Sequence, residues 1–300
     1  MAPPSIRCAN DWNVLADPAI SRGVCPFPFR KEHESVRSLI EPLISNGYTL
    51  EMTPERLGWL ESTDAGLPLE QLREKYRQNG YLWLKGFFER EVIVDFQRFF
   101  FDIVGSQEFE DFCTMPRLWN FYQEFLAGQP YLHKRKIMRF THPGDSHCTG
   151  GHYDLIYLRA GTDKLCTSWI PLGDIPVEMG GLIYLEHSDT VGRQMEAEFR
   201  VKNADLPPEE RINAYNRNMR ESGWVSTNLV EMADRFKSHW LIADYEAGDM
   251  VIHSPYMIHA ATLNHDPLNR SRLSTDIRYQ RVGDPIDPRW AKDWVLGDNL

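Results

Sequence analysis

The stretch Gly150-Gly151-His152-Tyr153-Asp154-Leu155-Ile156-Tyr157-Leu158 decides how this chain is interpreted. Two glycines and an H-x-D triplet lead into an apolar run, which predicts a strand over residues 153–158. Residues two apart in a strand point to the same side of a sheet, so His152 and Asp154 could bind one metal ion together. The same spacing recurs in His187-Ser188-Asp189, so the triplet by itself is a short and ambiguous signal.

A second histidine from another part of the fold would complete a metal site. His259 follows the segment Gly248-Asp249-Met250-Val251-Ile252-His253, in which a Gly-Asp turn leads into an apolar strand, and His253 is a competing candidate. Two imidazoles and one carboxylate on one face of an ion form the 2-His-1-carboxylate site of non-haem Fe(II) oxygenases. Such a site leaves coordination positions open for a cosubstrate and O₂.

Arg272 and Ser274 follow His259 closely and would share one face of a strand. A guanidinium binds a carboxylate with two parallel hydrogen bonds, and a neighbouring hydroxyl adds a donor. This pair would suit the distal end of a dicarboxylate cosubstrate such as 2-oxoglutarate. Arg270 is a rival for the same role.

The pattern of residues from about position 130 onward favours many short strands separated by Gly, Pro and Asp. It predicts a mainly β fold with flanking helices, whose core over 130–282 is a sandwich or a jelly roll, interrupted by a helical insertion at 190–240. The insertion would include a helix that begins at Asp205. The predicted strands cover residues 136–140, 153–158, 167–172, 182–185, 250–253 and 272–280.

The N-terminal part has a different character. Residues 1–35 are rich in Pro and polar residues and are expected to form an extended arm, and residues 36–128 are expected to be mainly helical. One helix would begin near Leu69 and stop at Asn79-Gly80, before a buried strand over 81–84. A second would run from about Glu89 into the aromatic stretch 99–101. All of these parts would belong to a single domain spanning 1–300.

Composition restricts the functions that this chain can have. The 300 residues are 42% hydrophobic and 25% charged, and the net charge of −10 argues against nucleic acid as a partner. Five cysteines without a C-x-x-C pair indicate a reduced, cytoplasmic protein. No secretory signal or membrane-spanning run is evident, so no membrane partner is expected. The apolar N-terminal helices could pack either on a second subunit, which would give a homodimer, or on the sheet.

Four segments together resemble the phytanoyl-CoA dioxygenase family of Fe(II)/2-oxoglutarate-dependent oxygenases, over roughly residues 69–282. In each of them the order of aromatic, glycine and polar positions is similar to that of a family motif. The segments are Asn79-Gly80-Tyr81-Leu82-Trp83-Leu84-Lys85-Gly86-Phe87-Phe88, Trp169-Ile170-Pro171-Leu172-Gly173-Asp174, Gly180-Gly181-Leu182-Ile183-Tyr184-Leu185-Glu186-His187-Ser188 and Arg272-Leu273-Ser274-Thr275-Asp276-Ile277-Arg278-Tyr279-Gln280.

The resemblance implies a double-stranded β-helix, or cupin-like jelly roll, and a full set of site residues. Fe(II) would be held by His152, Asp154 and His259, and 2-oxoglutarate by Arg272 and Ser274. Trp169 and Thr167 would line the cosubstrate pocket. The loop before Arg272 is longer than is typical of the family, so Arg270 remains an alternative for binding 2-oxoglutarate. His187 corresponds to a histidine that has a structural role in the family, so the pair His187 and Asp189 is not expected to bind the metal.

By the same resemblance the enzyme would oxidise a small organic substrate, such as a secondary metabolite, with release of succinate and CO₂. The outcome could be hydroxylation, desaturation, epoxidation or rearrangement. A cupin-type metal-dependent hydrolase or isomerase without 2-oxoglutarate, and a catalytically silent binding protein, are alternatives. An acyl-CoA substrate would favour a basic rim, for which His133-Lys134-Arg135-Lys136 is the one candidate cluster.

Overall fold

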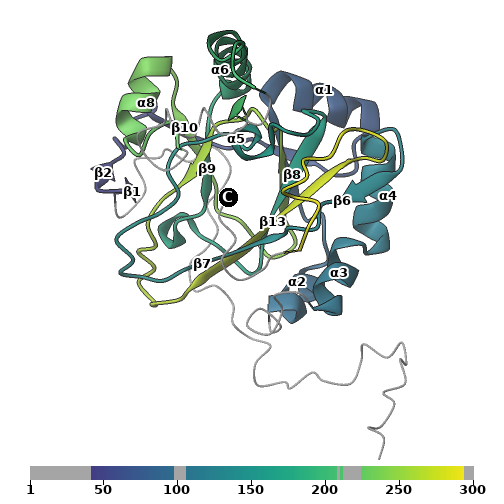
Figure 1. The fold of residues 1–300 in the computed structure, drawn as a ribbon. Helices are drawn as coiled ribbons and strands as arrows, with labels where there is room; N and C mark the ends of the chain where they lie inside the picture. Colours follow the sequence, from purple (N-terminus) through teal and green to yellow (C-terminus); the bar gives the residue numbers. More distant parts are fainter. Residues whose placement is uncertain (1–41, 98–105, 208–209, 212–223, 294–300) are drawn as a thin grey trace, which may run out of the picture.

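The computed structural model describes residues 42–97, 106–207, 210–211 and 224–293. Within these ranges two β-sheets form the body of the molecule, and several helices cover the outer side of the larger sheet (Figure 1). Aromatic and aliphatic side chains from both sheets, including Trp169, Tyr184 and Tyr245, pack into one buried cluster between them. The predicted fold class, a mainly β jelly roll with flanking helices, is confirmed.

The larger sheet provides most of the inner surface. Its strands are ordered β4 (Ser62–Asp64), β5 (Tyr81–Lys85), β11 (Met250–His253), β8 (Leu165–Pro171), β13 (Arg272–Arg281) and β6 (Pro130–Leu132), and β7 (Ile137–Thr141) also pairs with β13. The pairs β11–β8 and β8–β13 are antiparallel, so strands distant in sequence lie side by side.

The smaller sheet has the order β12 (His259–Ala261), β9 (Leu182–Leu185), β10 (Trp240–Ile242) and β3 (Leu57–Trp59). A separate hairpin joins β1 (Ile44–Ser45) to β2 (Tyr48–Thr49). The 3-10 helix η3 (Val177–Met179) precedes β9.

The long strand β13 shows how the sequence separates the two sides of the larger sheet. Its odd-numbered apolar residues, including Ile277 and Tyr279, join the outer core cluster, in which they pack with helices α1 (Leu69–Asn79), α3 (Gln107–Cys113) and α4 (Pro116–Phe125). Its even-numbered residues are polar and face the other way, although they are buried: Arg272, Ser274, Asp276 and Arg278. A row of buried polar groups on the inner side marks the place where a site can form.

Most of the predicted elements are observed. The first helix covers Leu69–Asn79 and stops at Gly80, which has the left-handed φ of 77° that favours glycine. The strand after it is β5, and α2 (Arg90–Gln97) follows. The strands predicted at 182–185 and 250–253 match β9 and β11.

The predicted strand over 153–158 is wrong. Residues Leu155–Leu158 form the short helix α5, and Asp154 at its start already has helical torsion angles, with φ −63° and ψ −30°. The apolar run is buried as expected, but a short buried helix and a short buried strand have the same hydrophobic pattern. Strand alternation therefore does not explain why His152 and Asp154 point to one place.

The range 36–128 carries helices α1 to α4, but its described residues begin with strands β1 to β4. The hairpin turn is Asn46-Gly47, with φ of 51° and 85°, a known signal for a two-residue hairpin. Strands β3 and β4 add in parallel to β10 and β5, so tertiary pairing decides their conformation.

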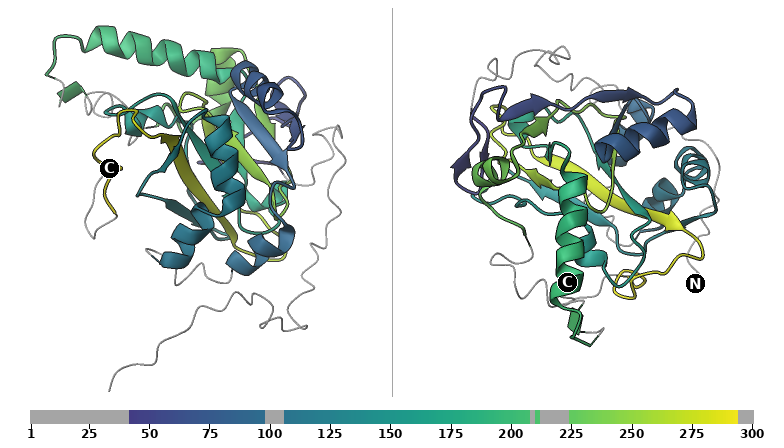
Figure 2. Two further views of the ribbon diagram at one scale, coloured as in Figure 1. Left: turned by 90° about the vertical axis from the view of Figure 1, so that its right-hand side faces the viewer. Right: turned by 90° about the horizontal axis from the view of Figure 1, so that it is seen from above.

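The insertion at 190–240 contains α6 (Ser188–Lys202) and α8 (Leu229–Phe236), and α6 extends beyond the sheets (Figure 2). The expected arm at 1–35 and the aromatic stretch 99–101 lie outside the described residues, as does most of the helix expected from Asp205.

Two further expectations concern the chain as a whole. No helix in the described ranges combines the length and the apolar character that are needed to cross a bilayer. Among the described cysteines, Cys113, Cys148 and Cys166 are buried free thiols.

Gly192→Ala should destabilise the protein by about 2 kcal/mol or more, because a Cβ atom there would lie 2.1 Å from the backbone oxygen of Tyr256. Urea unfolding of the purified variant would measure the loss. Gly66→Ala is the matched control, since its Cβ would meet the flexible side chain of Asp64 at 3.2 Å. Equal stability of the two variants would contradict the close packing of α6 on the segment before His259.

Candidate active site

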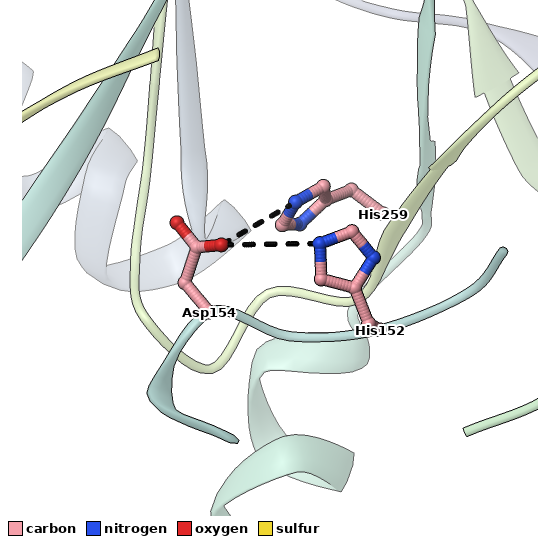
Figure 3. Close-up of side chains that lie close together, drawn as sticks. All are labelled: His152, Asp154 and His259. Carbon is pink, nitrogen blue, oxygen red and sulfur yellow. Dashed lines mark ion pairs between the residues drawn. The ribbon is translucent and has the colours of Figure 1, made fainter. Parts of the chain in front are cut away.

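Three buried side chains, His152, Asp154 and His259, place one possible ligand atom each within 4.8 Å of one another. The Nε2 atoms of the two histidines lie 3.9 and 3.8 Å from the same carboxylate oxygen, Asp154 Oδ1 (Figure 3). These are the three residues that the sequence predicts as metal ligands. The structure brings them together although His259 is remote from the other two along the chain.

Backbone hydrogen bonds fix this meeting. The amide of His152 donates to the carbonyl of His259 at 3.0 Å, and the amide of His259 donates back at 2.8 Å. Asp154 reaches the site from the turn that begins α5, where the amide of Leu155 donates to the carbonyl of Pro255 at 2.8 Å. The loop before His259 is thus tied to both ends of the H-x-D segment.

The two imidazoles are arranged so that their Nε2 atoms can act as electron-pair donors. Nδ1 of His152 lies 2.9 Å from the carbonyl oxygen of Gly150, and Nδ1 of His259 lies 2.9 Å from that of Met257. Because a carbonyl accepts only, both Nδ1 atoms must carry the proton. Each neutral ring then presents an unprotonated Nε2 toward Asp154, as metal-binding histidines do.

The electrostatics favour the charge states that a metal needs. Burial lowers the pKa of His152 to about 4 and holds that of His259 well below its usual value, so both rings are neutral. Burial alone would raise the pKa of Asp154, but the Arg278 guanidinium and His253 hold it well below its usual range. A carboxylate with two neutral imidazoles is therefore the stable state.

Further groups orient the Asp154 carboxylate. Thr167 donates a short hydrogen bond to Oδ2, and Nε2 of His253 lies 3.4 Å from the same oxygen. Nη2 of Arg278 lies 3.2 Å from Oδ1. Oδ1, which faces both imidazoles, is the oxygen that is positioned to bind a metal ion.

The donor set fits a divalent transition metal. Two neutral imidazoles and one carboxylate, all on one side of a common point, match the facial triad of non-haem iron sites. Structural zinc sites normally use four protein ligands, and only three converge among the described residues. The three-residue set therefore fits a catalytic metal with open coordination positions, as the facial triad of non-haem iron has, and does not fit a closed structural zinc site.

The structure distinguishes the two arginines that the sequence left as rivals. Arg270 is partly exposed and binds both carboxylate oxygens of Asp266, at 2.9 and 2.8 Å. Arg272 is buried, its Nη1 donates to the carbonyl of Gly180 at 2.9 Å, and burial lowers its pKa to about 10. Neither Nε of Arg272 nor the hydroxyl of the neighbouring Ser274 has a hydrogen-bond partner among the described residues.

Trp169 and Thr167 lie on the inner side of the larger sheet but differ in their contacts. Trp169 is buried, its ring centroid lies 4.6 Å from that of Tyr245, and its Nε1 finds no partner in the described part of the chain. Thr167 hydrogen-bonds to the carboxylate of Asp154. Its observed contact is thus with the candidate metal ligand.

The second H-x-D copy has a structural place. The ring of His187 is largely exposed, and its backbone has a left-handed φ of 55° at the start of α6. The hydroxyl of Ser188 accepts the amide of Ile258 at 2.9 Å, and Asp189 accepts a hydrogen bond from Ser254. This segment braces the loop that carries His259 and lies outside the metal-ligand cluster.

Sequence reasoning gave no role to Arg278, and it treated His253 only as a rival ligand. His253 lies behind the site, where its Nδ1 is 2.9 Å from the hydroxyl of Tyr184. The guanidinium of Arg278 stacks 4.3 Å from the ring centroid of Trp290. The alternation of residues along β13 could have identified Arg278 as a site residue, because Arg278 lies on the same face of the strand as Arg272 and Ser274.

Comparison with known structures supports this description. SnoN from nogalamycin biosynthesis, solved with Fe³⁺, α-ketoglutarate and nogalamycin RO, is 17% identical with a TM-score of 0.53, covering 77% of this chain and 91% of SnoN. EctD from S. alaskensis with bound Fe is 13% identical with a TM-score of 0.53, covering 87% and 94% of the two chains. At these identities the likeness establishes the fold. No curated protein matches the chain in sequence.

The fold and the site thus define a jelly-roll protein with a 2-His-1-carboxylate cluster. The family model described as Phytanoyl-CoA dioxygenase (PhyH) matches residues 109–271, more than half of the chain, so the chain belongs to the phytanoyl-CoA dioxygenase family. The predicted enzyme class, a non-haem iron and 2-oxoglutarate-dependent oxygenase, is confirmed by this match together with the His-Asp-His cluster.

The metal-free protein should lose stability as the pH falls from about 6.5 to about 4. Folded His152 has a pKa of about 4, whereas the unfolded value is about 6.5, so the unfolded state binds more protons in this window. The loss attributable to His152 is at most about 3 kcal/mol. Urea unfolding at several pH values should show a smaller loss for His152→Gln than for the wild type. His187→Gln, at an exposed position, should lose as much stability as the wild type. The prediction would be refuted if the free energy of unfolding fell equally with pH in the wild type and in both variants.

Asp154→Ala and His259→Ala should each lower the affinity for Fe(II) by about 100-fold or more, because each removes one of three ligands. Anaerobic equilibrium dialysis of the purified protein measures this directly. His187→Ala is the matched control from the second H-x-D copy. If it lost as much affinity as Asp154→Ala, the metal site would have been assigned to the wrong copy.

Proposed function

We propose that this protein binds iron through His152, Asp154 and His259 and 2-oxoglutarate through Arg272 and Ser274, and that it oxidises a small organic substrate. With iron, 2-oxoglutarate and O₂ bound, such a site supplies an oxidant that takes a hydrogen atom from a substrate carbon, with succinate and CO₂ as co-products. The protein's own residues bind and orient these components and exclude water.

One observation supports the cosubstrate assignment above the others. Arg272 is a buried guanidinium whose one hydrogen bond among the described residues is to a neutral carbonyl, that of Gly180. A buried charge without an ionic partner is costly, and a carboxylate is the natural ligand for its fork of donors. Ser274, two residues along the same strand face, adds a hydroxyl that has no partner among the described residues. A metal-dependent hydrolase or isomerase would leave this charge without a role.

The remaining inner-face residues would shape the pocket. Trp169 offers an indole N–H and a flat apolar surface between the metal cluster and Arg272 along the sheet, consistent with a place beside the cosubstrate. Thr167, by its hydrogen bond to Asp154, would keep the carboxylate turned so that Oδ1 faces the imidazoles. We assign Thr167 to orienting the ligand, in place of a role in lining the pocket.

The chemistry of the surface supports a small substrate over an acyl-CoA. In the one basic cluster of the sequence, His133 is buried and lies 2.8 Å from Oε1 of Gln280, and Lys136 pairs with Glu110. Arg135 is also buried. These residues therefore do not form an open basic rim for phosphates.

The similar structures SnoN and the carbocyclase SnoK act in nogalamycin biosynthesis, which favours a secondary metabolite as the substrate class here. The shape of the pocket would then decide which substrate binds, and the position of the target carbon in the pocket would decide the outcome of the oxidation. The free buried cysteines are consistent with a reducing compartment such as the cytoplasm.

Arg272→Gln should weaken 2-oxoglutarate binding about ten- to hundredfold, since it removes a charge-assisted hydrogen-bonded pair. Anaerobic titration of the Fe(II)-loaded protein with 2-oxoglutarate measures the affinity without any knowledge of the substrate. Arg270→Gln is the matched control and should bind 2-oxoglutarate like the wild type, because Arg270 is engaged by Asp266. A loss in Arg270→Gln with no loss in Arg272→Gln would reverse the assignment.

A further inference from the structure

Arg278 is a second buried guanidinium on the inner face of β13, and it lies at the metal cluster itself. In the sheet it is paired with Thr167, whose hydroxyl binds Asp154. Only 2% of its surface is exposed, and Nη2 is 3.2 Å from Asp154 Oδ1. Oδ1 is the oxygen that both histidines face, so the guanidinium edge borders the place where the metal would bind.

The hydrogen-bonding capacity of Arg278 is mostly unused. Nε and Nη1 are buried and have no hydrogen-bond partner among the described residues. Cζ of the guanidinium lies 4.3 Å from the ring centroid of Trp290, so the indole covers one side of the group. The two nitrogens without a partner, Nε and Nη1, are therefore the part that can meet a ligand. Trp290 is itself held by its Nε1, which donates to the carbonyl of Tyr157 at 3.0 Å.

Charge balance also leaves Arg278 in need of an anion. Arg139, the other guanidinium close to the cluster, is paired with Asp276 at 2.7 Å. Among the residues that the structure describes, Arg278 pairs only with the carboxylate of Asp154, which a metal ion would share. A metal ion bound to Oδ1 would lie next to the guanidinium, because Nη2 is 3.2 Å from that oxygen. One carboxylate does not balance the charge of a divalent metal and a guanidinium in a buried site, so a further anion beside both would be favourable.

We propose that Arg278, backed by Trp290, forms a second carboxylate-binding position next to the metal, separate from that of Arg272. The inference rests on the proposed function, since it takes the metal to be bound by Asp154. Two sources could supply the carboxylate: the keto-acid end of 2-oxoglutarate, or a carboxylate on the organic substrate close to the carbon that is oxidised. Arg272 and Arg278 are six residues apart on one strand, so their backbones are separated by roughly 20 Å. One carboxylate group cannot serve both.

The test uses the full-length protein loaded anaerobically with Fe(II), and it compares Arg278→Gln with Arg281→Gln. Arg281 is the matched control: it ends the same strand, is 42% exposed in its side chain and pairs with Asp284 at 3.1 Å. Two affinities are measured by calorimetry. The first is for 2-oxoglutarate. The second, at saturating 2-oxoglutarate, is for benzoate relative to its neutral analogue benzamide.

The expected result is a loss of about tenfold or more in one of these affinities for Arg278→Gln only, the size of one charge-assisted contact. A loss for 2-oxoglutarate identifies the keto-acid end as the carboxylate. A loss of the preference for benzoate, with 2-oxoglutarate binding intact, identifies a substrate carboxylate. Arg278→Lys, which keeps the charge without the fork, should recover part of the loss.

Two results would overturn the inference. One is that Arg278→Gln, folded and metal-loaded, retains both affinities. The other is that its only defect is weaker Fe(II) binding, which would restrict Arg278 to holding Asp154. If the wild type itself failed to bind 2-oxoglutarate, the proposed function would fail. The benzoate comparison on the Fe(II)-loaded protein without cosubstrate would then still decide whether Arg278 binds a carboxylate.

Discussion

The buried carboxylate of Asp154 is the constraint on which the site depends. A carboxylate without charged or hydrogen-bonding partners would not remain ionised in this interior. Thr167, His253 and Arg278 provide those partners from three neighbouring strands of one sheet. Arg278 and His253 hold the pKa of the carboxyl well below its usual range. The antiparallel register of β11, β8 and β13 therefore also positions the site, because it places these donors side by side next to Asp154.

The jelly roll suits this arrangement because it separates two environments across one sheet. The outer side is apolar and packs against helices α1, α3 and α4, which supplies the burial that stabilises the domain. The inner side can then carry arginines, histidines and aspartates at positions that pair with one another. Gly192 and the Ser188–Ile258 contact hold α6 against the loop before His259, so even the insertion contributes to placing a metal ligand.

The sequence predicted correctly that His152, Asp154 and His259 come together, but it predicted the local structure around them less well. His152, Asp154 and His259 were identified by spacing together with the resemblance to a family, but the reason offered, strand alternation, was wrong because Asp154 begins helix α5. Strands with clear alternation or turn signals, such as β9 and β11, were predicted within their observed bounds. Strands β3 and β4 were missed because they are short edge strands that exist only through pairing with β10 and β5.

The sequence by itself determined which candidate site residues are present and in which order they occur along the chain. They are an H-x-D pair, a distant histidine, and an arginine and a serine on one strand face. Local patterns suffice for this, because residue type and spacing are properties of the chain alone. The tertiary structure decided which copies of each motif are brought together in the interior. It exposed His187 and buried His152, paired Arg270 with Asp266, and left Arg272 without an ionic partner among the described residues. Those choices depend on burial and on contacts between segments distant in sequence, and both are properties of the folded molecule.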